Sequence, residues 1–174
     1  DDATAIAAAE RAFELGINLL DTSPLYGRGL AEHRCGTVIR RVPRQDIVVC
    51  TKVGRWMDPF HLPVDDSGFV GGQPHRAVVD YSYDGTMRSV EQSLLRLGTD
   101  RLDLLLIHDV DVWTHGIDAI EDLLAARQQV AQHRHPGDPV QRLRYGRLHP
   151  GAETGGEDHG GRGLLAPQGT RLIA

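Results

Sequence analysis

The stretch Asp21-Thr-Ser-Pro-Leu-Tyr-Gly27 decides the fold, because it closes the apolar run of residues 17–20. A short run rich in leucine and isoleucine that ends in turn residues is typical of a buried strand that continues into a loop. Two later apolar runs end in the same way, one at Lys52 and the other at His108. Three successive strands are therefore predicted, each with an ionisable residue at its C-terminal end.

The segments between these strands have helical patterns. The predicted strands are residues 17–20, 47–51 and 102–107, and the predicted helices are residues 3–15, 30–41, 83–97 and 118 to about 127. Alternation of helices and strands predicts an α/β fold with a parallel sheet and right-handed crossovers. Residues 53–80 stay unassigned because they hold four glycines and three prolines without periodicity. A long irregular stretch of this kind is usually functional.

Composition limits the partners that we expect. The formal net charge of −5 argues against nucleic acid or an anionic membrane as the main partner. No apolar run approaches the roughly 18 residues needed to span a bilayer, and no signal peptide is visible. The two cysteines, Cys35 and Cys50, form no metal or redox motif. These features predict a cytoplasmic protein. Because the sequence opens at the start of a predicted helix without a methionine, we also expect residues to precede it.

Residues 127–174 differ from the rest of the chain. Half of these 48 residues are Gly, Pro, Arg or His, and none of their apolar runs has the length of a strand. We therefore predict two parts, an ordered α/β domain over residues 1–126 and a poorly structured segment over residues 127–174. A frameshifted reading of a GC-rich gene would give the same composition, and sequencing of the coding DNA would test that hypothesis.

Four side chains are the candidate catalytic residues: Asp21, Tyr26, Lys52 and His108. Taken alone, each has a structural explanation. Asp21 could cap a turn, Tyr26 could pack in a loop, Lys52 could be a solvated strand end, and His108 could be a buried core histidine. Their shared position at strand ends favours a functional site, because functional side chains of an α/β barrel project from the C-terminal ends of its strands.

Such a set of groups can handle a proton. A free phenol titrates near pH ~10 and is a poor proton donor at neutral pH. A nearby ammonium group favours the phenolate, and a carboxylate keeps that ammonium charged and in place. An imidazole on the next strand could orient a carbonyl or hydroxyl oxygen beside the phenol. No glycine-rich phosphate-binding loop accompanies these residues, because Gly27-Arg28-Gly29 is too short for the dinucleotide fingerprint.

The same residues resemble the aldo-keto reductases, whose catalytic tetrad is aspartate, tyrosine, lysine and histidine. Asp21, Tyr26, Lys52 and His108 match it residue by residue, with the family's five-residue step from aspartate to tyrosine. The stretches of residues 80–85 and 108–116 look similar to the sugar-oxidising branch, which contains the D-threo-aldose 1-dehydrogenases and L-fucose dehydrogenases. The resemblance covers residues 3 to about 124.

The resemblance implies a (β/α)8 barrel, a cofactor that is NADP or NAD, and hydride transfer between nicotinamide and an aldose or another aldehyde or alcohol. Tyr26 would donate or accept the proton, and Trp56 would line the substrate pocket. A full barrel needs ~250 residues, whereas about three βα units are visible. The family's first strand and strands five to eight, which carry most of the cofactor site, are missing. We therefore expect an incomplete barrel that self-associates through open sheet edges. A catalytically inactive remnant is the alternative.

Two other functions have less support in the sequence. Metal-dependent chemistry could use His108, Asp109, Asp111 and His115, but these residues lack the helix spacing of a known metal motif. A nucleic-acid-binding arm in the arginine-rich residues 127–174 is disfavoured by their acidic residues and by the negative net charge. We expect no metal and no nucleic acid.

Overall fold

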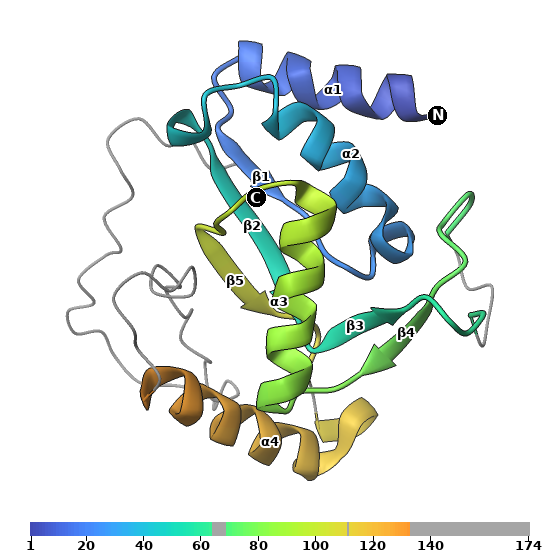
Figure 1. Cartoon of the computed structure of the whole chain (residues 1–174), viewed down its shortest axis with the longest axis vertical. Helices are drawn as coiled ribbons and strands as arrows, with labels where there is room; N and C mark the ends of the chain where they lie inside the picture. Colours follow the sequence, from blue (N-terminus) through green and yellow to red (C-terminus); the bar gives the residue numbers. More distant parts are fainter. Residues whose placement is uncertain (64–68, 111, 133–174) are drawn as a thin grey trace, which may run out of the picture.

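Helices and strands alternate along the chain (Figure 1). The computed structural model describes residues 1–63, 69–110 and 112–132. Its helices are α1 (Asp2–Glu14), α2 (Leu30–Ile39), α3 (Tyr83–Leu97) and α4 (Val112–Gln132), and its 3-10 turns are η1 (Tyr26–Gly29) and η2 (Arg44–Asp46). Its strands are β1 (Leu19–Asp21), β2 (Val48–Val53), β3 (Arg55–Asp58), β4 (Arg76–Val79) and β5 (Leu104–Ile107). In this part of the chain no helix has the length and apolar character that crossing a membrane requires.

Strands β1, β2 and β5 form a parallel sheet in the order β1-β2-β5. Helix α2 connects the first two strands, and α3 lies between β2 and β5 in the chain. The predicted α/β fold with a parallel sheet is therefore confirmed for the described residues. Because the strands run in the same direction, their C-terminal ends meet at one edge of the sheet. The residues that follow those ends come together there.

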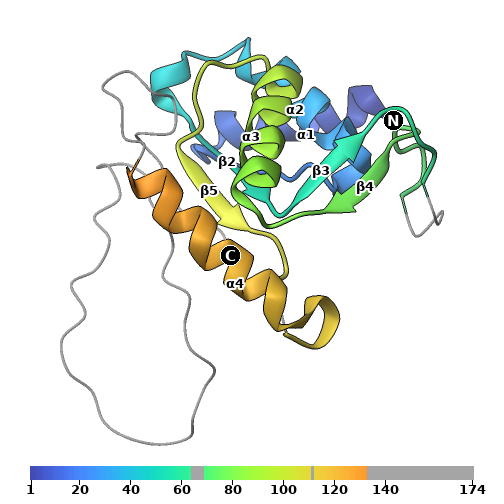
Figure 2. The same cartoon turned by 60° about the horizontal axis from the view of Figure 1, so that its bottom comes forward.

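Helices α1, α2 and α3 lie in a row along the sheet, and both views show this arrangement (Figures 1 and 2). The core between helices and sheet is made of buried aliphatic side chains, including Val49, Val90, Leu97 and Leu105. Gly36 lets α2 approach α3, because a Cβ atom at this position would lie 2.7 Å from the carbonyl oxygen of Leu97.

Strands β3 and β4 form an antiparallel hairpin within residues 53–80, for which the sequence pattern predicts no regular element. The hairpin starts one residue after β2, so it stands beside the C-terminal edge of the parallel sheet (Figure 1). Arg55 pairs with Val79, and Asp58 pairs with Arg76. Each strand has only four residues, and a long connection separates them, so neither has enough residues for a visible period-two pattern.

Helix α4 is longer than the sequence pattern predicts. It begins at Val112 and contains a break at Gly116, whose φ of 78° and ψ of 171° are not helical. The predicted helix starts only after this glycine, at residue 118. The predicted end of this helix, near Arg127, also comes too early, because α4 continues to Gln132. Residues 127–132 are thus helical, and the remainder of the predicted poorly structured segment, residues 133–174, lies outside the described residues.

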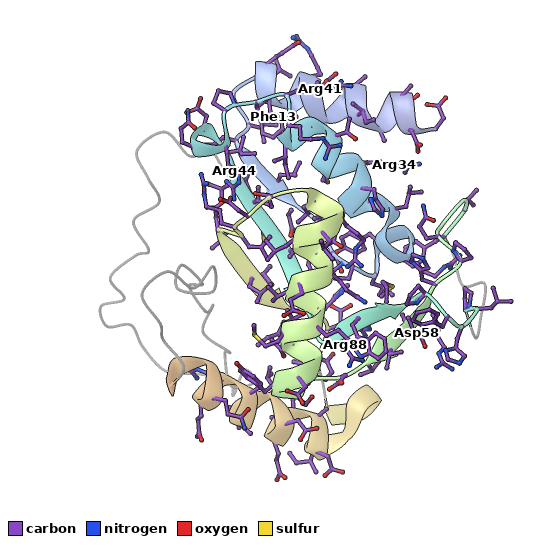
Figure 3. The ribbon with its side chains drawn as sticks, in the orientation of Figure 1. Phe13, Arg34, Arg41, Arg44, Asp58 and Arg88 are labelled. Carbon is purple, nitrogen blue, oxygen red and sulfur yellow. The ribbon has the colours of Figure 1, made fainter. Side chains whose placement is uncertain are left out.

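Arg44 links the N-terminal ends of β2 and β5, at the end of the sheet opposite the hairpin (Figure 3). The guanidinium group of Arg44 donates to the carboxylate of Asp103 at 2.7 Å and to the backbone oxygens of Ile47 and Arg101. The Asp103 carboxylate also accepts from the backbone N–H of Val49 at 2.8 Å. This carboxylate therefore helps to hold together the N-terminal ends of β2 and β5. The candidate site lies at the C-terminal ends of the same two strands.

We expect Asp103→Ala to destabilise the fold by about 2–3 kcal/mol, because the largely buried guanidinium of Arg44 loses its counter-charge. Urea denaturation would measure the loss. Asp100→Ala is the control, since Asp100 is highly exposed and 3.5 Å from Arg101, and it should change the free energy of unfolding by less than about 1 kcal/mol. Equal effects of the two substitutions would contradict this role of Asp103.

Candidate active site

The register of the parallel sheet places Asp21 and Lys52 on the same side. Asp21, the last residue of β1, pairs with Cys50 of β2. Lys52 follows Cys50 by two residues, so its side chain lies on the same face of the sheet and nearer the C-terminal edge. The buried thiol between them stays protonated at neutral pH, because burial first and then the charge of Asp21 raise the pKa of Cys50 to about 12.

The ammonium group of Lys52 is held by two oxygens. It donates to Asp21 Oδ1 at 2.9 Å and to the backbone oxygen of Thr22 at 3.0 Å. Burial acts to lower the pKa of Lys52, but the hydrogen bond and charge of Asp21, followed by those of Tyr26, outweigh burial and raise that pKa. Lys52 therefore stays charged at neutral pH and places a fixed positive charge beside the loop that follows β1.

Tyr26 lies over this positive charge. Tyr26 is the first residue of η1, which follows β1 in the chain. The Lys52 Nζ atom lies 4.9 Å from the centroid of the Tyr26 ring. The ring of His108 meets the phenol edge to face, with 5.6 Å between centroids and an interplanar angle of 85°. Tyr26 remains 38% exposed, so a small molecule can reach it.

His108 directly follows β5, and both its backbone and its side chain make hydrogen bonds. Its N–H donates to the oxygen of Val53 at 2.9 Å, and its own oxygen accepts from Tyr81 Oη at 2.7 Å and from Arg55 Nη1 at 2.8 Å. Its Nδ1 atom lies 2.9 Å from Ser23 Oγ. Burial first, and then the charge of Arg55, lower the pKa of His108 below its ordinary value. The ring is therefore neutral at pH 7.

The turn that carries Tyr26 is fixed from the other side by the connection between β3 and β4. Arg28 Nε donates to the backbone oxygen of Gln73 at 2.7 Å, and the N–H of Gln73 donates to the oxygen of Gly27 at 2.9 Å. Arg28 is buried and has a φ of 54°, which is a strained backbone conformation for a residue with a side chain. These two hydrogen bonds hold the turn in place.

Trp56, the candidate substrate-binding residue, lies on β3. Its ring packs under the guanidinium group of Arg88, with 4.5 Å between the guanidinium carbon and the ring centroid. Figure 3 shows Arg88 on α3 beside the hairpin. Trp56 is thus held by α3, and it makes none of the contacts that join Asp21, Tyr26, Lys52 and His108. Its role in substrate binding stays a prediction.

Three residues that support the site were not singled out from the sequence: Ser23, Arg55 and Tyr81. Ser23 lies within the stretch that decides the fold, but its partner is 85 residues away. Tyr81 packs its ring against Gly54, where a Cβ atom would lie 2.1 Å from the ring, so the turn between β2 and β3 requires glycine. Contacts of this kind depend on the assembled sheet, and no local pattern signals them.

The residues suggested for a metal site do not cluster in the part of the chain that the structure describes. There, no group of three or more His, Cys, Asp or Glu side chains could hold a metal ion. Asp111 and the side chain of His115 lie outside the described residues.

The lowered pKa of His108 predicts a pH-dependent stability. In the unfolded chain an imidazole titrates near pH ~6.5. Below that pH the side chain of His108 binds a proton in the unfolded chain, whereas in the folded protein it stays neutral. The unfolded state then binds more protons, and stability falls as pH drops below 6.5 until the lowered folded pKa is reached. Burial also lowers the pKa of His33, which adds to the effect. We expect His108→Asn to reduce the difference in unfolding free energy between pH 8 and pH 5. An unchanged difference would contradict the assignment.

Together the four side chains can move a proton to or from a bound oxygen. A phenol beside a fixed ammonium can donate a proton and take one back, and a neutral imidazole next to it can position the oxygen that receives the proton. None of the four groups can carry a hydride. An oxidation or reduction at this site would therefore need its electron pair from another molecule.

Comparisons of this chain with known proteins point to a single protein family. The model of the aldo/keto reductase family matches residues 1–132. The chain is 41% identical over 124 residues to pyridoxal 4-dehydrogenase from Microbacterium luteolum, covering 65% of this chain and 36% of that protein. It is 36% identical over 131 residues to D-threo-aldose 1-dehydrogenase from a Pseudomonas species, covering 67% of this chain and 36% of that protein.

A solved structure agrees with these sequence relatives. The holo form of an aldo-keto reductase from Bacillus halodurans superposes with a TM-score of 0.58 at 29% sequence identity, covering 83% of this chain and 41% of that chain. The chain thus spans about a third of the length of the curated relatives it matches. The match includes the strands and the turn that carry Asp21, Tyr26, Lys52 and His108.

Proposed function

Because the chain belongs to the aldo/keto reductase family, we propose that it takes part in NAD(P)-dependent oxidoreduction of an aldose or another small aldehyde or alcohol. Tyr26 is the proton donor in reduction and the proton acceptor in oxidation. The observation that carries the proposal is the ammonium of Lys52, which is bonded to Asp21 at 2.9 Å and lies 4.9 Å from the Tyr26 ring. An aldose is supported by the relative that is a D-threo-aldose 1-dehydrogenase.

The residues present suit a nicotinamide partner. None of the Asp, Tyr, Lys and His side chains can carry a hydride, so an oxidation or reduction at this site needs a separate hydride carrier. When bound, the nicotinamide supplies or accepts that hydride. Tyr26 at 38% exposure and Asp21 at 49% side-chain exposure are the members that a cofactor and substrate can reach. Lys52 keeps a positive charge beside the phenol through the proton transfer, and His108 positions the reacting oxygen.

The fold that we propose for this activity is a (β/α)8 barrel, of which the described residues supply three parallel strands with their helices. The superposed reductase supports that fold. An inactive remnant that keeps the tetrad but does not hold the cofactor is the second candidate.

A cofactor titration separates the two candidates. The purified chain is mixed with NADPH or NADH, and the fluorescence of the reduced nicotinamide is followed. Micromolar binding together with turnover of an aldose in a panel of sugars and simple aldehydes supports the reductase. No detectable binding of either cofactor supports the remnant. A preference between the two cofactors would also assign NADP or NAD.

Self-association through the outer strands is a further expectation. Among the described residues, β1 and β5 are each paired on one side only, and Leu106 on β5 is 37% exposed. Unpaired strand edges are templates for pairing with another chain. We expect sedimentation velocity to show dimers or larger species, increasing with protein concentration. A single monomeric species with a sharp cooperative thermal transition would contradict this expectation.

A further inference from the structure

We propose that Ser23 is a positioning residue that fixes the protonation of His108. In this assignment the Ser23 hydroxyl donates to Nδ1 of His108, so the ring carries its single proton on Nε2. The consequence for catalysis rests on the proposed function, whereas the position of the proton does not.

The contacts of the Ser23 hydroxyl determine its direction. Ser23 is 0% exposed, and its Oγ atom accepts from the backbone N–H of Leu25 at 3.2 Å. A hydroxyl has one proton and two acceptor positions. Among the described residues, the only acceptor within reach of the remaining proton is His108 Nδ1 at 2.9 Å. If Nδ1 carried the proton instead, the buried O–H of Ser23 would be left without an acceptor, which is costly.

The other side of the ring leads to the same assignment. His108 Nε2 lies 3.4 Å from Oδ2 of Asp109. An ionised carboxylate only accepts hydrogen bonds, so it favours a proton on the nitrogen that faces it. The neutral state of the ring is supported by burial and by the nearby positive charge of Arg55, which lower the pKa of His108. One proton on the ring, with Nδ1 accepting from Ser23, is therefore a proton on Nε2.

This tautomer makes His108 a hydrogen-bond donor toward the site. The centroid of the ring lies 5.6 Å from that of Tyr26. A carbonyl oxygen that takes the place of the 75% exposed Asp109 carboxylate beside Nε2 would accept from the imidazole N–H. The other tautomer would present a lone pair from Nε2 and repel that oxygen. Ser23 thus selects which tautomer faces the substrate while it remains buried behind the histidine.

Nitrogen-15 NMR of the protein labelled at histidine tests the assignment directly. The signal of His108 is identified by its absence in His108→Asn, since the sequence has nine histidines. At pH 8 we expect a protonated Nε2 and an unprotonated Nδ1 in the unaltered protein. Ser23→Ala should give a mixture of the two tautomers, and Ser23→Thr, which keeps a hydroxyl, should restore the single tautomer. Ser93→Ala, at another fully buried serine, should leave the His108 signals unchanged.

Turnover provides the second readout. Ser23→Ala should lower kcat/KM by about tenfold, with recovery in Ser23→Thr, because the alanine leaves the ring free to adopt either tautomer. A proton on Nδ1 in the unaltered protein would overturn the assignment, whether or not the protein turns over. An unchanged tautomer in Ser23→Ala would overturn the role of Ser23. The expected spectra in a protein without turnover would support the tautomer and count against the proposed function.

Discussion

Tyr26→Phe should lower turnover by a factor of about 10²–10⁴ and leave nicotinamide affinity nearly unchanged, since positioned proton donors contribute that much to a rate. The substitution removes only the hydroxyl. The phenylalanine ring would keep the contact with Lys52 Nζ and the edge-to-face contact with His108. The turn that carries residue 26 is fixed by Arg28 and Gln73, so its conformation should not change.

Single-turnover kinetics and a fluorescence titration of NADPH would measure the two quantities separately. Tyr83→Phe is the matched control, because it removes a phenol hydroxyl from the first turn of α3, outside the four-residue site. It should leave the rate within about twofold of the unaltered protein. A Tyr26→Phe rate close to that of the control would end the assignment of Tyr26 as the proton donor.

Glu32→Ala should destabilise the fold by about 3–5 kcal/mol, the usual cost of breaking a buried ion pair. Glu32 on α2 is fully buried, and its carboxylate accepts from Thr51 Oγ1 on β2 at 2.6 Å and from Arg96 Nε on α3 at 2.6 Å. It thus connects a strand and a second helix at one point. Without it, the guanidinium of Arg96, whose side chain is 9% exposed, would stay buried without a counter-charge.

Urea denaturation of two further variants would show that burial sets this cost. Glu14→Ala breaks an ion pair with Arg11 in which both side chains are 64% exposed, and it should cost less than about 1 kcal/mol. The double variant Glu32→Leu, Arg96→Leu removes both charges and should recover much of the loss, because apolar replacement of a buried pair is often neutral. A Glu32→Ala protein as stable as the Glu14→Ala protein would contradict the expected role.

The sequence was sufficient to predict those features that depend on local pattern and chain direction. Residues 83–97 form a helix because Met87, Val90 and leucines recur on or near one face between Ser82, which caps the start, and Gly98. The gathering of Asp21, Lys52 and His108 follows from three parallel strands, whose ends must meet at one edge. The family was also recognisable, since the aspartate-to-tyrosine spacing lies in a single short stretch.

Features that depend on distant contacts could not be predicted. The β3–β4 hairpin joins two four-residue strands whose pairing crosses a long connection, so neither strand has a pattern of its own. The start of α4 was missed because Gly116 interrupts the helical pattern. The hydroxyl behind His108 belongs to a residue 85 positions earlier, and the tyrosine that fixes the histidine backbone comes from the segment between β4 and α3.

Lys52 is the only lysine in a chain whose remaining eighteen basic residues are arginines. An acylating reagent that is selective for primary amines therefore finds a single side chain, and that side chain lies in the candidate site. Because its side chain is 11% exposed and its ammonium is held by Asp21 and Thr22, modification should be slow and sensitive to whatever covers the site. The mass gained by one peptide over time would then report occupancy of the site in a crude mixture, without any assay of turnover.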